Sequence, residues 1–421
     1  MSDDGMHWGD PMNRARIERL LLATTATSLV VLVPWFVSCA ASDSSPGSSP
    51  DGSDTTIGET GADADAGAAN DAASEAGCDA SDDACVSTVI SCSNADWCPE
   101  DTGVSTNVAL TSVWGSGPKD VWASGSAGTL AHYDGTAWVI TPTKPAVQNT
   151  FQAVWGSGPN DVWAVSMTDV IFHSTGFANG TAKWEMVTAA TPSGRDFTRV
   201  ATALWGTGPD DVRIGARAYA QQDPETTEYV LYNQFTKTTA EDGGLAWTEE
   251  RGDGTVHAFW GSSANDFWYV ADNSPKNGWQ RGLTMHATRG AKGLQWQNVD
   301  SQSSFTLEGI WGSSANDVWA VGDKGTLRHF TGGARWDIVE SVTNMPLHAV
   351  WGTAANDIWA VGEAGTILHF DGTEWKPSTA AFKLGNKPNL LSVWGSSAND
   401  VWIVGDSVAL HYTGPKGDAT K

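Results

Sequence analysis

The chain has 421 residues, of which 40% are apolar and 10% aromatic, so it can bury a large core. Its 49 acidic residues face only 24 basic ones, which gives a formal net charge of -25 at pH 7. A nucleic-acid-binding protein needs Lys and Arg to displace counterions from phosphates, so this charge balance excludes that class.

The N-terminal segment has the pattern of an export signal. Arg14, Arg16 and Arg19 precede an apolar run over residues 20–37, and Ser38 and Cys39 follow it, which predicts a signal peptide over residues 1–39. Residues 36–39 resemble a bacterial lipobox, and this resemblance implies lipidation of Cys39. The alternative is an uncleaved anchor, because about eighteen apolar residues can just span a bilayer. Either way we expect an exported protein anchored in the cell envelope, at the outer membrane or the cell surface.

An acidic, low-complexity stretch comes next. Residues 40–104 contain fourteen Asp and Glu and no Lys or Arg. Because residues 40–77 also lack aromatic side chains, they cannot bury enough surface to fold, and we expect a disordered acidic tether there.

Residues 78–98 form a cysteine-rich segment. Its cysteines are Cys78, Cys85, Cys92 and Cys98. An even set in an exported segment predicts two disulfides, with three possible pairings. Zinc is the alternative, but no Cys-x-x-Cys spacing occurs and no His lies nearby.

Seven copies of one pattern, Trp-Gly-Ser/Thr leading to Asp-Val-Trp, fill the rest of the chain. They begin at Val113, Val154, Leu204, Phe259, Ile310, Val350 and Val393. Each copy reads as four short strands with Gly or Asp-Gly turns, and no helical period occurs. Four-stranded units at a spacing of 40–55 residues predict an all-β fold, a seven-bladed β-propeller over residues 95–416.

Several positions recur in the copies. The first Trp of each copy is expected to be an apolar wedge between blades, and the residue two before it is always small, as crowding near the axis requires. Each copy has an Asp at the turn into its second strand, such as Asp120, and six copies have a His in the third strand, such as His132. The other five histidines are His173, His286, His329, His369 and His411, and Asn233 is assigned to this position in the third copy. We expect these histidines to make structural hydrogen bonds, because equivalent positions on different blades lie too far apart to share a metal ion.

The last copy ends at residues 412–414 without the Trp that opens a fourth strand. Trp97 precedes Trp114 by 17 residues, within the spacing at which this Trp precedes the next copy elsewhere. We therefore predict that Asp96 and Trp97 supply the missing outer strand and close the ring.

These residues together resemble a known class of propellers. The repeat over residues 350–375 has the order VWG, DIWAVG, GTxxH and DGxxW, and residues 95–414 are similar to secreted bacterial propellers of the photosystem II assembly factor-like and BNR (Asp-box) class. The Gly-His to Trp-Asp order of WD40 repeats is absent. The resemblance implies the fold and export, but the class has no uniform activity.

Insertions in the third and fourth copies are candidate binding loops. They lengthen the connection between the second and third strands and are expected to project from one face. Their candidate residues are Tyr219, Gln221, Gln222, Glu225, Trp279, Gln280 and Arg281. A loop Trp beside an Arg is typical of a binding hot spot, although Trp279 could instead pack under its own loop.

A second candidate set lies at the start of three successive inner strands. His257, Glu308 and His348 could converge near the axis and hold a divalent metal or perform acid–base chemistry. The alternative is a polar channel mouth without chemistry.

Taken together, the sequence favours a monomeric, membrane-tethered binding or assembly module whose partner is an envelope protein or a glycan. No catalysis and no cofactor are expected. The alternative is a glycan-active hydrolase or lyase of the BNR type with an axial site, but no inner-strand position carries the Arg that a propeller sialidase needs.

Overall fold

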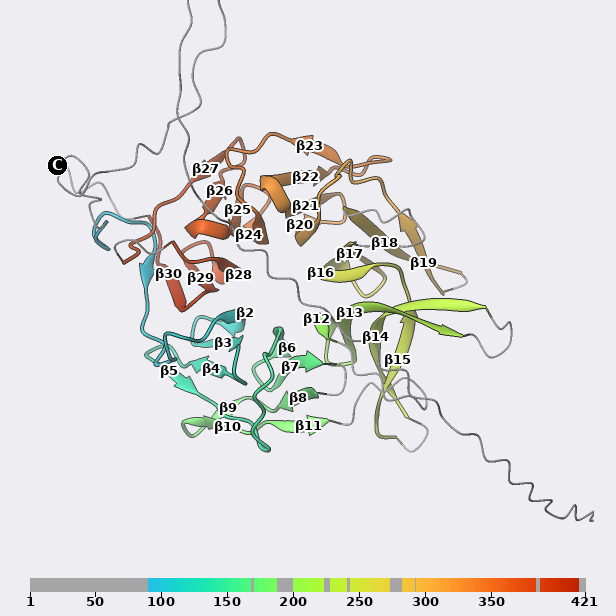
Figure 1. The fold of residues 1–421 in the computed structure, drawn as a ribbon, viewed down its shortest axis with the longest axis horizontal. Coiled ribbons are helices and arrows are strands. Elements are labelled where there is room, and N and C mark those ends of the chain that lie inside the picture. Colours follow the sequence, from blue (N-terminus) through green and yellow to red (C-terminus); the bar gives the residue numbers. More distant parts are fainter. Residues whose placement is uncertain are drawn as a thin grey trace, which may run out of the picture. The chain divides into compact units, whose positions relative to one another are not determined.

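The computed structural model describes residues 90–167, 170–187, 200–222, 228–240, 243–272, 282–291, 293–383 and 387–415. Its strands form four-stranded antiparallel sheets that are arranged as seven blades around a central axis (Figure 1). The prediction of a seven-bladed β-propeller is confirmed. The expected signal peptide, Cys39 and acidic tether lie outside the described residues, so those expectations stay predictions. Within the described part, no helix has the length and hydropathy needed to cross a membrane.

The first four blades follow one another in chain order. Blade 1 consists of β2 (Leu110–Gly117), β3 (Asp120–Gly125), β4 (Leu130–Tyr133) and β5 (Trp138–Ile140). Blade 2 consists of β6 (Ala153–Gly158), β7 (Asp161–Met167), β8 (Val170–Ser174) and β11 (Glu185–Val187), with a small ribbon of β9 (Phe177–Ala178) and β10 (Thr181–Ala182). Blade 3 consists of β12 (Ala201–Gly208), β13 (Asp211–Gln222), β14 (Tyr229–Thr239) and β15 (Leu245–Arg251). Blade 4 consists of β16 (Thr255–Ser263), β17 (Asp266–Asp272), β18 (Leu283–Gly290) and β19 (Gly293–Asn298).

The remaining blades complete the circle. Blade 5 consists of β20 (Leu307–Ser314), β21 (Asp317–Gly322), β22 (Thr326–Phe330) and β23 (Asp337–Val339), with the short 3-10 helix η2 (Asp323–Gly325). Blade 6 consists of β24 (Leu347–Ala354), β25 (Asp357–Gly362), β26 (Ile367–Phe370) and β27 (Trp375–Pro377), with η3 (Glu363–Gly365). Blade 7 consists of β28 (Leu390–Ser397), β29 (Asp400–Gly405), β30 (Val408–Tyr412) and β1 (Cys98–Pro99). Figure 1 shows β1, in blue, beside the red strand β30.

The first Trp of a blade packs over the Gly that follows the first Trp of the next blade. A Cβ built on Gly156 would lie 2.6 Å from the Trp114 ring, and one on Gly312 would lie 2.7 Å from the Trp260 ring. The same contact occurs in six of the seven joints. The exception is Trp205, whose ring stacks instead on Phe259 and Phe267 of blade 4. The predicted wedge is confirmed, and the Trp-Gly pair recurs because any larger residue would collide with the wedge.

A second layer of tryptophans joins the blades farther from the axis. The Trp of each second strand meets the outer-strand Trp of the next blade edge to face, as in Trp319–Trp375, with ring centroids 5.4 Å apart. This geometry suits the positive edge and negative face of aromatic rings. Blade 3 lacks the pair because Arg213 replaces its second-strand Trp, and the Arg213 guanidinium lies 4.3 Å from the Phe267 ring centroid.

Trp97 occupies the outer-strand position of blade 7. Its ring meets the Trp359 ring of blade 6 edge to face, with ring centroids 4.9 Å apart, and it is fully buried. The outer-strand tryptophans of other blades make the same contact with the preceding blade. The Trp97 indole donates to Ser378 Oγ (3.2 Å). The Asp96 carboxylate accepts from Ser378 Oγ (2.8 Å) and from the Thr379 amide (2.9 Å). The predicted closure of the ring by the N-terminal strand is confirmed.

Candidate functional site

The candidate binding residues that the structure describes belong to one end of the blades. Because the strands of a blade are antiparallel, the connection that enters its first strand and the turn between its second and third strands lie at the same end. We call this end of the ring the upper face. The opposite end carries the turn between the first and second strands and is called the lower face.

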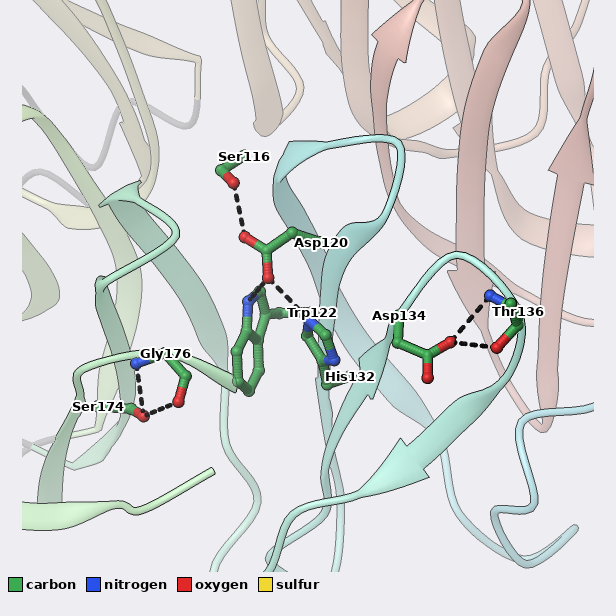
Figure 2. Close-up of polar contacts among 8 residues, drawn as sticks. All are labelled: Ser116, Asp120, Trp122, His132, Asp134, Thr136, Ser174 and Gly176. Atoms are coloured by element: carbon green, nitrogen blue, oxygen red, sulfur yellow. Dashed lines mark hydrogen bonds and ion pairs between the residues drawn. The ribbon is translucent and has the colours of Figure 1, made fainter. Parts of the chain in front are cut away.

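A repeated polar cluster lies at the lower face (Figure 2). The Asp120 carboxylate accepts from the Trp122 indole (3.0 Å), from His132 Nε2 (2.7 Å) and from Ser116 Oγ (2.6 Å). The Asp–His bond recurs in six blades at 2.6–2.9 Å. The expectation that these histidines make structural hydrogen bonds is confirmed.

Hydrogen bonding also sets the acidity of these carboxylates. Burial by itself would raise the pKa of Asp357, but the bonds from His369 and Thr353 outweigh it and bring the pKa below its ordinary value of 3.8. The pKa values of Asp120, Asp161 and Asp400 are lowered in the same way. In these four blades the repeated Asp is therefore charged and engaged within its own blade, and it is a structural group.

The assignment of Asn233 to the histidine position in blade 3 is wrong. Thr236 faces Arg213 there and accepts from its guanidinium (3.2 Å). The β13–β14 ladder shifts between Gly215 and Tyr219, and this irregularity moves the third strand relative to the sequence pattern. Asn233 is buried elsewhere and donates to the carbonyl of Asp253 (2.9 Å).

The axial candidates line a cavity of about 330 Å³ at the mouth of the central channel. His348 Nδ1 donates to Glu308 Oε2 (2.5 Å), which joins blades 5 and 6, whereas His257 Nε2 lies 3.3 Å from Asp272 Oδ1 in its own blade. Burial by itself would lower the pKa of His348, but the bond and charge of Glu308 outweigh it and raise this pKa above 6.5. Among the described residues, no three His, Cys, Asp or Glu side chains are placed to hold one metal ion.

Neighbouring positions on this rim also connect adjacent blades. Thr111 Oγ1 donates to the Phe151 carbonyl and Thr202 Oγ1 to the Val256 carbonyl, both at 2.5 Å. The polar rim therefore has a structural role in joining the blades.

The blade 3 insertion continues the sheet as a hairpin. Tyr219 pairs with Tyr232, and Gln222 pairs with Tyr229, which is 73% exposed. The Tyr219 side chain is buried and donates to Glu249 Oε1 (2.7 Å), so it supports the hairpin from inside. Gln221 lies on the same strand, opposite Val230. Glu225, Trp279, Gln280 and Arg281 lie outside the described residues.

A larger hollow lies beside the closing strand, and no sequence pattern predicted it. This groove has a volume of about 900 Å³, and its described lining residues come from three segments: residues 99–106, residues 381–383 with 387–389, and residues 406–409. The first segment leaves the closing strand for blade 1, the second enters blade 7, and the third is the turn between β29 and β30. All three belong to the upper face. We call this hollow the seam groove.

The described cysteines lie next to this closing segment. Cys98 Sγ donates to the Cys92 carbonyl (3.7 Å). Because Cys78 and Cys85 lie outside the described residues, the two disulfides stay a prediction.

No protein-family model and no curated protein matches the chain, but solved structures do. YCF48 from Cyanidioschyzon merolae is 16% identical over 75% of this chain and 98% of its own, with a TM-score of 0.54. A structure of YCF48 bound to D1 peptide is 16% identical over 76% and 97%, with a TM-score of 0.55. A streptogramin B lyase structure is 13% identical over 75% and 97%, with a TM-score of 0.54. At these identities the likeness confirms the β-propeller fold.

Proposed function

We propose that this chain is an exported, membrane-tethered binding module of the cell envelope, which captures a protein partner on the upper face of its propeller. The observation that carries this proposal is the seam groove, a hollow of about 900 Å³ with both apolar and charged lining residues. The surrounding blades are locked to one another by the Trp-Gly and Trp–Trp contacts. Binding to such a rigid surface costs little ordering entropy on the side of the propeller.

The comparisons support a protein partner. A propeller of this fold, YCF48, has been seen with a D1 peptide bound, so the fold can present a surface to a peptide. Lipidation of Cys39 and membership of the secreted bacterial BNR class rest on the sequence pattern alone. A glycan remains the other class of partner.

Catalysis at the axis is the alternative function. It is favoured by one observation, the His348–Glu308 pair at the channel mouth, whose raised His pKa suits proton transfer near neutral pH. His257 does not join this pair, because it lies against Asp272. A glycan hydrolase or lyase would release product from envelope polysaccharide, and Glu308→Gln would abolish that release.

The binding function is tested by capture from an envelope extract with the tagged full chain. Thr106 lines the groove and is exposed, so Thr106→Trp should block it and abolish capture. Thr175, exposed on the lower face of blade 2, provides the control variant Thr175→Trp, which should capture normally. Retained capture by Thr106→Trp would refute the groove as the site. Loss of capture in a Trp279→Ala, Arg281→Ala variant would then place the site on the insertions.

A further inference from the structure

The seam groove has opposite charges on two of its sides. Residues 99–106 contribute Glu100 and Asp101, which we call the acidic wall, and the second segment contributes Lys383 and Lys387, which we call the basic wall. All four side chains belong to exposed residues. In the acidic wall, Glu100 Oε1 lies 4.0 Å from His411 Nδ1, and Asp101 Oδ1 accepts from the Gly103 amide (2.9 Å). A ligand with charges of both signs that meets both walls would bind in one direction only.

Three apolar side chains that line the groove are held in place by the core. Phe382 packs against the core of blades 6 and 7, and a Cβ on Gly365 would lie 2.7 Å from its ring. Val104 packs against the core of blades 7 and 1, and Val408 rests on the core beside Trp97. These side chains offer apolar surface against which an apolar side chain of a ligand can be buried.

Hydrogen bonds hold the three segments of the groove together. The Asn389 amide donates to Asp406 Oδ2 (3.0 Å), and the Asp406 amide donates to the Asn389 carbonyl (2.9 Å). Ser407 Oγ donates to the Thr106 carbonyl. Asp406 is therefore engaged in holding the second and third segments together.

The lining favours a peptide over a sugar. A pyranose ring is usually held by stacking on Trp or Tyr, yet no Trp or Tyr that the structure describes lines the groove. Phe382 is the one aromatic residue among the described lining residues. An extended peptide, in contrast, can present acidic, apolar and basic side chains along one short segment.

We propose that the seam groove binds an extended peptide segment of mixed charge. An acidic side chain of this segment faces the basic wall, an apolar side chain rests on Phe382 and Val408, and a basic side chain faces the acidic wall. This inference rests on the proposed function and adds to it the chemistry and the direction of the partner segment.

The experiment is a selection of random dodecapeptides displayed on phage, with the purified full chain as bait. The enriched peptides should carry an acidic and a basic residue on either side of an apolar one, in a constant order. For the best peptide, fluorescence anisotropy should show a Kd at least tenfold weaker for the double variant Lys383→Glu, Lys387→Glu. The control double variant Lys144→Glu, Lys183→Glu makes the same change of net charge at exposed sites outside the groove, and its Kd should stay within twofold.

Charge reversal of the peptide provides a gain-of-binding test. A peptide whose basic residue is replaced by Glu should bind the variant Glu100→Lys, Asp101→Lys more tightly than it binds the unchanged protein. Melting temperatures of all variants check that they fold, and the single variants Lys383→Ala and Lys387→Ala replace any that do not.

Two results would overturn the inference: a selection without a charge rule, or equal binding by the groove and control variants. The proposed function would survive either one if capture from envelope extract is still lost in Thr106→Trp. If Thr106→Trp captures normally while the selected peptides obey the charge rule, the groove binds peptides but is not the capture site.

Discussion

Replacing Trp97 with Ala tests how the ring is closed. Trp97 is fully buried against Trp359 and Tyr412, and its indole donates to Ser378. Removing a buried Trp costs about 3–5 kcal/mol, and the lost hydrogen bond adds about 1 kcal/mol. At roughly 2 °C per kcal/mol for a domain of this size, the melting temperature should fall by roughly 8 °C or more.

The matched control is Trp375→Ala, which removes the equivalent ring from blade 6. Trp375 is also buried and packs edge to face on Trp319, so its melting temperature should fall by a similar amount. Only Trp97→Ala should release the closing strand, because no turn of the chain connects this strand to the other strands of blade 7. Hydrogen exchange separates the two: the amide of Glu100, which donates to the Ala409 carbonyl, should exchange rapidly in Trp97→Ala alone. Unchanged melting and unchanged exchange in Trp97→Ala would refute closure by this strand.

Three further predictions concern the repeated contacts and the titrating groups. Gly312→Ala should lower the free energy of unfolding by about 1–3 kcal/mol in urea titrations, because its Cβ would collide with a Trp ring. Gly117 has open space around it, so the control variant Gly117→Ala should change this free energy by no more than about 0.5 kcal/mol. Equal effects of the two variants would contradict the role of the Trp as a wedge. The lowered pKa of Asp357 stabilises the fold above pH 3.8, and this contribution is lost as pH falls through the folded pKa. The free energy of unfolding should therefore drop on acidification, and Asp357→Asn should reduce that drop. Identical pH profiles of the two proteins would argue against a stabilising role of the Asp357 charge. The raised pKa of His348 stabilises the fold below pH 6.5, and this contribution is lost as pH rises through the folded pKa. NMR titration should show a lower His348 pKa in Glu308→Gln. An unchanged value would exclude the contact with Glu308 as the cause of the raised pKa.

The sequence predicted those features that repeat. Blade number, the wedge tryptophans and the Asp–His bonds follow from residues that recur in every or nearly every copy. The closing role of Trp97 followed from a single missing Trp and one matching spacing. Because the pattern occurs in seven copies, each position is observed several times, and one irregular copy does not change the assignment of the fold.

The features that failed prediction are those that do not repeat. The irregularity in β13 gave no sequence signal, so Asn233 was placed where Thr236 stands. The seam groove combines residues 99–106 with residues 381–383, 387–389 and 406–409, and its charged walls lie on connections that differ from blade to blade. Its position depends on the path that the closing segment takes, which the repeat pattern does not specify.

The interlocking of each wedge Trp with the next blade's Gly bears on the ancestry of this ring. A copied blade forms a regular joint when its Trp meets a Gly in the unit that follows, as in six of the seven joints. Blades 1–3 carry Gly-Pro in the lower turn, whereas blades 4–7 carry Ala-Asn. The joint between blades 3 and 4, where Trp205 stacks on Phe267 instead of covering a Gly, falls at the boundary between these two sets. The irregular joint thus coincides with the change of turn sequence along the chain, whereas the joint between blades 7 and 1 keeps the regular contact of Trp394 with Gly115.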